Sequence, residues 1–302
     1  FMDNNSVVAF YSLSDPDGTD ILSSSSALYN LSSGRMGGYG FASVLIPHTP
    51  NFSAKAGTWT FKNYSNDRVK LSLRTGSTPS AATITVQPYI TGTTWSANDI
   101  ASALSVMSNI YNTNGITLSL KDTITISESQ YATVSSSFTD STTSALVSQG
   151  SKDTVNLFFV EDQPSSETAL FGVSAGLPGT MGIASSWNGV INYLSAHATG
   201  STLNSQLLGE TAAHEMGHWL GLFHTTEANG TSFDPLSDTA QCAISRDNDN
   251  DAKVYPEECV GYGADNLMFW TAWSTSSQAA GKKQENLSSE QQYILKYSPI
   301  AR

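Results

Sequence analysis

Three of the chain's five histidines, His214, His218 and His224, lie in one short segment. Residues four apart share one face of a helix, so a helix here presents the imidazoles of His214 and His218 side by side. Glu215 leaves that face at an angle, where its carboxylate can hold a water as a general base. Gly221 lets the chain leave the helix and return His224 to the same ion, because a residue without Cβ enters the left-handed region without steric cost. Three neutral imidazoles leave a fourth zinc position open for water, which is typical of a catalytic zinc site.

The segment from His214 to His224 matches the pattern H-E-x-x-H-x-x-G-x-x-H at every fixed position. A pair of histidines four apart is usually a surface or core feature, whereas the complete pattern, with its glycine and third histidine, is that of zinc proteases. The expected chemistry is hydrolysis of peptide bonds by a metal-activated water, with protein or peptide substrates. His48 and His197 have no motif around them and are interpreted as structural or surface residues.

The motif resembles that of the metzincin metalloproteases, whose signature includes a methionine turn beneath the metal. The resemblance implies an α+β fold, with a catalytic domain built from a twisted mixed sheet and a zinc-site helix. It makes Met268 the turn methionine, since Asn266 to Met268 looks like the N-x-M of that turn and no other methionine follows His224. Ordinary packing in the core is the other interpretation of Met268.

Within the metzincins, the chain is most similar to the pappalysin and cytophagalysin type. The similarity rests on Trp219 to Leu222, on the threonine after the third histidine, and on Asp234 to Thr239. That type commonly has a tyrosine two residues after the turn methionine, where this chain has Trp270, whose indole donates one hydrogen bond but offers no phenol. Tyr262 is a weaker candidate for the tyrosine's role. The resemblance also implies that an edge strand within residues 172–193 pairs with extended substrate.

The chain's two cysteines, Cys242 and Cys259, lie between the third histidine and Met268. In an exported protein we expect them to form one disulfide that closes this loop and stabilises the fold by about 3 kcal/mol through loop entropy. Two free thiols or a second metal site are the alternatives, and neither has the neighbouring cysteine or histidine that would support it.

Inside that loop, Asp247, Asp249 and Asp251 stand at alternate positions. Alternating carboxylates suit Ca²⁺, which takes six to eight oxygen ligands in loose geometry. Ala252 occupies the position of the glycine in a helix-loop-helix calcium hand, so that motif is excluded. A solvated acidic loop is the other interpretation. Zn²⁺ is therefore the expected cofactor, and Ca²⁺ is a second candidate.

The composition indicates an exported protein with a polar surface. Charged residues make up 13% of the 302 residues and the net charge is −12, which argues against a nucleic-acid binder. The sequence has no apolar run of the roughly 20 residues that a membrane helix needs. Because the chain begins at Phe1 without a leader, we expect a removed signal peptide and a secreted or cell-surface location.

Two regions are expected along the chain. Short β-rich stretches separated by Gly, Ser, Asn and Pro predict a small all-β sandwich domain in residues 1–80, followed by the metzincin-like domain in residues 81–302. In the first region, strands are expected at 6–12, 40–46, 57–62 and 69–74. In the second, strands are expected at 83–90, 116–126, 155–160 and 189–194. Helices are expected after Ser96, near 142–148, through the zinc motif and after Ser288, with Asp99 and Gln291 at the capping-box positions of the first and the last.

The predicted function is that of a secreted zinc-dependent endopeptidase with Glu215 as its general base. The alternative is a surface-binding or adhesive protein with a vestigial zinc site. An intact Glu215 beside three intact ligands favours the enzyme. A further interpretation keeps hydrolysis and gives the N-terminal domain the task of substrate targeting.

Overall fold

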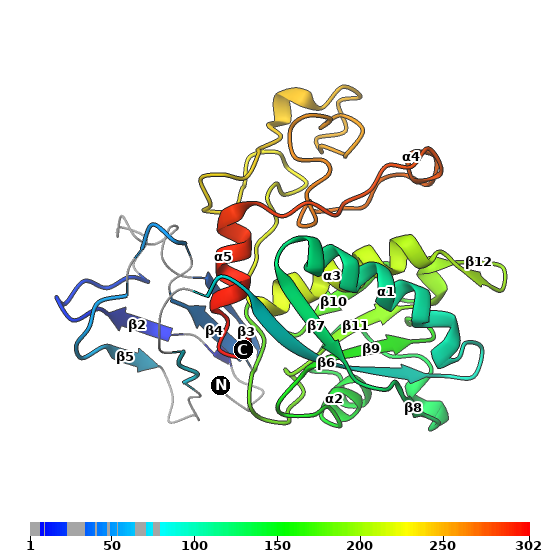
Figure 1. Cartoon of the computed structure of the whole chain (residues 1–302), viewed down its shortest axis with the longest axis horizontal. Coiled ribbons are helices and arrows are strands. Elements are labelled where there is room, and N and C mark those ends of the chain that lie inside the picture. The colour runs from blue at the N-terminus through cyan, green and yellow to red at the C-terminus, as the bar shows by residue number, and fades with distance from the viewer. Residues whose placement is uncertain are drawn as a thin grey trace.

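The computed structural model describes residues 7–8, 10–22, 34–39, 41–46, 49–52, 54–63, 71–74 and 79–302. In these residues the chain forms a mixed sheet with helices on both faces, small β-elements at the N-terminal end, and long loops between the third helix and the C-terminus (Figure 1).

The central sheet has six strands in the order β10-β11-β9-β6-β7, and β8 also pairs with β6. All its pairings are parallel except that of β10, which runs antiparallel to β11 and forms one edge. Every residue of β9 is buried, as expected for an apolar strand covered on both faces. The strands are β6 (Ala82–Thr91), β7 (Ile116–Leu120), β8 (Ile124–Ile126), β9 (Val155–Val160), β10 (Gly172–Ser174) and β11 (Val190–Tyr193).

Two long helices, α1 (Ala97–Thr113) and α3 (Ser205–Leu220), pack together over one face of this sheet (Figure 1). They approach closely at Gly209, where a Cβ would lie 2.6 Å from the Cβ of Val106. The Tyr111 hydroxyl in α1 donates to the Ala213 carbonyl in α3 at 2.9 Å. Helix α1 thus fixes the position of α3, which carries the first part of the histidine motif.

The other helices are shorter. Helix α2 (Ser141–Val147) packs on the opposite face of the sheet, where Leu146 and Val147 join the second core cluster. Helix α5 (Ser289–Tyr297) starts at the predicted capping box of Ser288 and Gln291 and adds Ile294 to the main core. The remaining elements are the helix α4 (Thr275–Ala279), the 3₁₀ turns Ser129–Tyr131, Ser195–His197 and Ile244–Arg246, and the hairpin of β12 (Ala198–Thr199) and β13 (Thr202–Leu203).

The described N-terminal residues form two small antiparallel sheets. One contains β1 (Val7–Val8), β3 (Gly34–Tyr39) and β4 (Phe41–Leu45), and the other contains β2 (Phe10–Ser14) and β5 (Thr60–Asn63). Their packing into a sandwich is not established, so the sandwich domain stays a prediction. The strand expected at 69–74 is wrong in its described part, because residues 71–74 have no regular structure, and β3 was not predicted. Residues 69 and 70 lie outside the described part of the chain.

One contact joins the N-terminal sheets to the end of α3. Leu45 packs against the main core, and a Cβ at Gly221 would lie 2.5 Å from Leu45 Cδ2. Leu45 of the N-terminal region therefore contacts the end of the zinc-motif helix.

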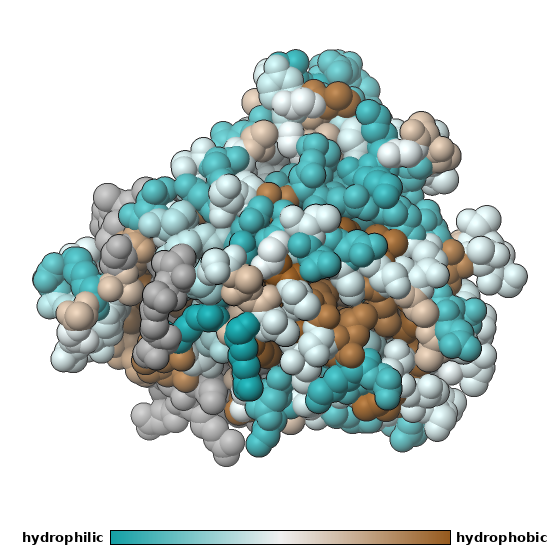
Figure 2. Space-filling view, viewed as in Figure 1, coloured by the Kyte–Doolittle hydropathy of each residue, from teal (hydrophilic) through white to brown (hydrophobic). Residues whose placement is uncertain are grey.

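On the face shown in Figure 2, hydrophobic side chains gather over the region of β6 and β7, and the C-terminal loops beyond them are mostly hydrophilic. The exposed large hydrophobic residues of the chain include Leu120 of β7 and Ile124 of β8. In the described part of the chain, no helix combines the length and the apolar character that crossing a membrane requires.

Candidate metal centre and catalytic site

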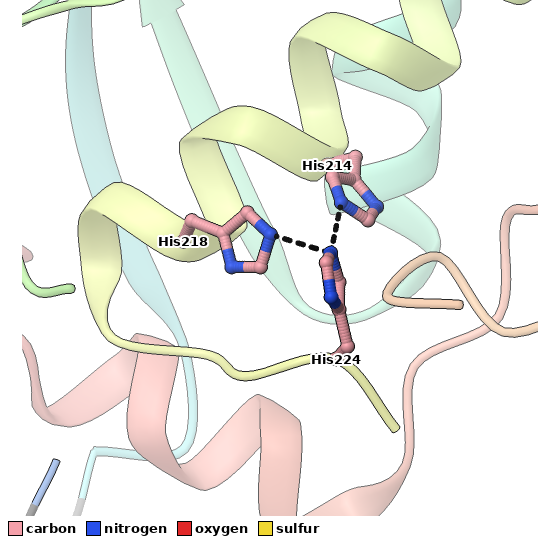
Figure 3. A group of neighbouring side chains, drawn as sticks. All are labelled: His214, His218 and His224. Atoms are coloured by element: carbon pink, nitrogen blue, oxygen red, sulfur yellow. Dashed lines mark hydrogen bonds between the residues drawn. The ribbon is translucent and has the colours of Figure 1, made fainter. Parts of the chain in front are cut away.

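Helix α3 and the turn after it bring the three histidines together. The side chain of Asn204 caps the helix by accepting from the Leu207 backbone N–H at 3.1 Å. The helix ends at Gly221, whose φ of 113° lies in the left-handed region that favours glycine, as predicted. Beyond this turn, the chain passes back across the helix and presents His224 to the two helical histidines (Figure 3).

The ε-nitrogens of the three rings converge on one point. His224 Nε2 lies 3.3 Å from His214 Nε2 and 3.0 Å from His218 Nε2 (Figure 3). Each ring uses its other nitrogen for a separate hydrogen bond. The Nδ1 of His214 donates to the Leu267 carbonyl at 2.6 Å, and the Nδ1 of His218 donates to the Leu222 carbonyl at 2.7 Å.

These outer hydrogen bonds determine which nitrogens are free to bind a metal. A carbonyl oxygen only accepts, so Nδ1 of His214 and of His218 carries the proton and Nε2 carries a lone pair. Burial, together with the neighbouring His224, lowers the pKa of His214 to about 3 and that of His218 well below its usual value. The rings are therefore neutral at physiological pH, with lone pairs turned toward one another. Converging lone pairs repel unless a cation lies between them, so the cluster fits a metal that prefers imidazole, such as Zn²⁺.

Glu215 lies next to this cluster, beneath the edge strand β10. A Cβ at Gly172 would lie 2.8 Å from Glu215 Cγ and 3.1 Å from Thr211 Cγ2, so the strand and the helix touch at this point. Burial raises the pKa of the Glu215 carboxyl to about 8, and a hydrogen bond from the Ser174 backbone N–H acts in the opposite direction. Burial thus favours the protonated form in the metal-free chain, and the Ser174 N–H holds the carboxyl against the sheet edge.

Met268 lies in a buried turn below the histidine helix. The Asn266 side chain accepts from the Met268 backbone N–H at 2.8 Å, and the Met268 carbonyl accepts from the Thr225 N–H at 2.9 Å. Its sulfur would lie 2.6 Å from a Cβ at Gly217, which explains the glycine in the middle of the motif. The preceding residue, Leu267, supplies the carbonyl that holds His214.

Cys242 and Cys259 are joined in a disulfide, and both are fully buried. They lie in a small core cluster with Val254, Phe269 and Trp273. This cluster is separate from the two that cover the faces of the sheet.

Trp270 and Tyr262 were considered in relation to the tyrosine that commonly follows the turn methionine. Both lie against the disulfide loop. Trp270 donates from Nε1 to the Val254 carbonyl at 2.6 Å and packs beside Tyr255. Tyr262 accepts a hydrogen bond from Arg246, whose guanidinium carbon lies 3.7 Å from the centre of the tyrosine ring. Their contacts hold the disulfide loop together.

The acidic loop gathers a different set of carboxylates from the one expected. Asp247 and Asp249 lie with Glu258, each offering an oxygen within 4.8 Å of the others, and Asp251 is not part of this group. Asp251 instead accepts from the Lys253 backbone N–H at 2.9 Å. The Glu258 carboxylate accepts backbone N–H groups from within the same loop, so hydrogen bonds already stabilise it.

His197 is a structural residue. It is buried, donates from Nδ1 to the Tyr193 carbonyl and accepts from the Thr211 hydroxyl at Nε2. Burial lowers its pKa to about 4, so it is neutral and ties β11 to α3. His48 lies outside the described residues.

Two features of the site were not predicted. Glu227 Oε2 accepts from His224 Nδ1 at 3.0 Å, and Gly172 and Ser174 place β10 directly on Glu215. A carboxylate three residues after the third histidine was the available signal for Glu227. The contact of β10 depends on tertiary packing and has no local signal.

Comparison with known proteins also indicates a metallopeptidase. Residues 97–225 match the model of the metallo-peptidase family M12B, reprolysin-like. An extracellular metalloprotease of Colletotrichum graminicola is 37% identical over 111 residues, covering 33% of this chain and 37% of that protein. Extracellular metalloprotease 1 of Coccidioides posadasii is 25% identical over 179 residues, covering 59% of this chain and 62% of that protein. The chain thus spans less than two thirds of either relative.

Among solved structures, archaemetzincin from Methanopyrus kandleri aligns with 70% of this chain and 93% of its own length. The TM-score is 0.37 and the identity 12%, a likeness too distant to support a conclusion.

Residues 97–225, with the histidine helix and part of the mixed sheet, are thus similar to a reprolysin-like metallopeptidase domain. This range includes all three histidines and Glu215. The predictions of a metzincin and of a metallopeptidase are confirmed. The assignment to the pappalysin or cytophagalysin type stays a prediction.

Proposed function

We propose that the chain is a secreted zinc endopeptidase whose zinc is held by His214, His218 and His224. The convergence of three ε-nitrogens, each with its other ring nitrogen engaged, carries this proposal. Zinc bound there supplies a Lewis acid that polarises a peptide carbonyl and makes water more acidic. With three protein ligands, the site keeps a position open for water or substrate.

Glu215 is the proposed general base. Its carboxylate takes a proton from the attacking water and passes it to the leaving amine, so that one water is consumed and an amine and a carboxylic acid form. The burial that raises its pKa makes the carboxylate a better proton acceptor. The Ser174 N–H restrains the carboxylate beside the sheet edge while the proton moves.

The edge strand β10 is the proposed binding site for the substrate backbone. It is the last strand on its side of the sheet, and its three residues are partly exposed. An extended peptide can add to such an edge through backbone hydrogen bonds. Since Gly172 touches Glu215, a peptide paired with β10 lies next to the base. The substrates are therefore extended segments of proteins or peptides.

The proposal also takes in the turn methionine and secretion. Met268 is the methionine of the turn beneath the histidines, as its position under Gly217 supports. Secretion is supported by the disulfide and by relatives named extracellular metalloproteases. Ca²⁺ in the acidic loop has no support beyond the gathered carboxylates of Asp247, Asp249 and Glu258.

The test combines metal analysis with mapping of cleavage products. Atomic emission on the purified chain is expected to give one zinc per molecule. Mass spectrometry of a proteome-derived peptide library is expected to show cuts at internal bonds. Glu215→Gln is the matched control, because it keeps the size of the side chain and removes the base. It should keep its zinc and lose activity about 10²- to 10⁴-fold. A zinc-loaded parent that cuts no peptide, or a variant as active as the parent, would refute the proposal and favour an adhesive protein with a vestigial site.

A further inference from the structure

The three zinc-facing histidines differ in what holds their outer nitrogens. His214 and His218 donate to the backbone carbonyls of Leu267 and Leu222. His224 donates to a side chain, the carboxylate of Glu227, at 3.0 Å. A backbone carbonyl carries no net charge. A carboxylate, in contrast, brings a full negative charge to the far side of one ring.

We propose that Glu227 is a positioning residue that orients His224 and strengthens it as a metal ligand. This inference rests on the proposed zinc site. A carboxylate behind a ligating imidazole fixes the proton on Nδ1, sets the plane of the ring and makes Nε2 a better donor to the metal. The charge is also attracted to the cation through the ring. Because the side chain of Glu227 is 46% exposed, water screens part of that attraction.

His224 needs such a restraint more than its two neighbours do. His214 and His218 are fixed on α3, a helix packed against α1 and the sheet. His224 follows the left-handed turn at Gly221 and lies outside any helix or strand. Backbone hydrogen bonds hold the chain on either side of it, from Leu222 N–H to Gly217 and from Thr225 N–H to Met268, and the partner of Nδ1 then sets the orientation of the ring.

The position of Glu227 is in turn fixed by a tight turn. The Glu227 N–H donates to the Ser232 carbonyl at 3.0 Å, and the Gly230 N–H donates to the Glu227 carbonyl at 2.9 Å. Neither bond uses the side chain of Glu227, so a substitution at this position leaves the turn intact.

The disulfide loop braces this turn. The Cys242 N–H donates to the Thr226 hydroxyl at 3.1 Å. The Ile244 N–H donates to the Gly230 carbonyl at 2.8 Å, and the Val254 N–H donates to the Ala228 carbonyl at 2.9 Å. A Cβ at Gly230 would lie 2.6 Å from the Ile244 nitrogen, which shows how closely the two segments fit. The loop closed by Cys242 and Cys259 thus stabilises the turn that carries Glu227, and Glu227 in turn accepts from His224.

The test compares the parent with Glu227→Ala, Glu227→Gln and the control Glu257→Gln. The control removes one negative charge from the same loop region, but the Glu257 carboxylate accepts from Ser274 and Ser277. Zinc affinity is measured by competition with a chelator, and Co²⁺-loaded protein is measured by visible absorption. Circular dichroism of the metal-free chains checks that each variant is folded.

We expect Glu227→Ala to lose zinc affinity on the order of 10- to 100-fold. Glu227→Gln should lose less, because its amide oxygen still accepts from Nδ1 although the charge is gone. Both variants should shift the Co²⁺ absorption bands, and the control should match the parent in affinity and spectrum.

Equal affinity and equal spectra in all four proteins would overturn the role of Glu227 and leave the zinc site standing. A parent that binds no zinc at the histidines would overturn both. If Glu227→Ala fails to fold, the Gln variant decides the question by the same two measurements.

Discussion

Removing the Cys242–Cys259 disulfide tests how firmly the loop beside the site is held. The bond closes a loop with a sequence separation of 17 residues. In the chain-entropy treatment, a loop of this length stabilises the folded state by about 3 kcal/mol. For a chain of this size, that corresponds to a fall in Tm of about 5 °C. Both cysteines are fully buried, so Cys242→Ala with Cys259→Ala adds a small loss from the space left by the sulfurs.

The assay is urea unfolding of the oxidised parent, the same parent reduced with a phosphine, and the double alanine variant. Reduction breaks the cross-link without removing the sulfur atoms, so it separates loop entropy from the cavity. Each unfolding curve is recorded with a chelator and again with zinc, because a bound metal adds stability of its own. Identical midpoints for oxidised and reduced parent in chelator would refute the reasoning. If the loop also braces Glu227, reduction should weaken zinc binding as well.

Four further outcomes are expected. His224→Ala should lose most bound zinc together with activity, and normal zinc content by atomic emission with intact turnover would contradict the three-histidine site. Gly172→Ala should destabilise the fold by about 1–3 kcal/mol in urea and lower activity, because its Cβ would lie 2.8 Å from Glu215 Cγ; unchanged stability and turnover would refute this close packing. Burial raises the pKa of the Asp234 carboxyl from 3.8 to about 7. In metal-free protein the buried carboxyl therefore lowers the stability of the folded state as pH rises from about 4 to 7. Asp234→Asn should therefore be more stable than the parent at pH 8, by at most about 4 kcal/mol, with a smaller gain at pH 4; a gain independent of pH would count against this. If Ca²⁺ binds the acidic loop, Tm should rise with Ca²⁺ but not with Mg²⁺, by an amount worth about 2.7 kcal/mol at a hundredfold excess over Kd. Asp249→Ala should abolish this rise, and an equal response to both ions would indicate plain charge screening.

The histidine cluster was predictable because its geometry is local. The spacing of His214 and His218 follows from the helix repeat, and the left-handed turn at Gly221 follows from the lack of a Cβ. Both effects act within a few residues. The capping boxes at Ser96 and Ser288 were equally local, and the helices begin where those residues indicated.

Features that depend on tertiary packing were less accessible. The strands of the central sheet followed from apolar runs, but their order brings together segments far apart in the chain. The acidic loop illustrates the same limit. Asn250 and Ala252 have φ values of 61° and 67°, so the chain reverses between them and alternate positions no longer share a side. Glu258 consequently takes the place expected for Asp251.

The N-terminal region contacts the rest of the chain through single side chains. Alternating short stretches predict a small sandwich there, and they do not predict that Leu45 packs on the end of α3 or that the Asn51 amide donates to Glu290 at the start of α5. Contacts between regions are encoded by single side chains, which carry no periodic signal. The proposed boundary near residue 80 therefore divides two parts that share an interface.

Mutation affects the hydrogen-bond partners of the three histidines differently. A backbone carbonyl persists whichever side chain it belongs to, so positions 222 and 267 can change identity and still accept from His218 and His214. The partner of His224 exists only while position 227 encodes an acceptor. If the three histidines bind zinc, a single codon outside the histidine motif can then vary the strength of the metal site among descendants of this gene without altering a ligand. Selection for tighter or looser metal binding can therefore act on position 227.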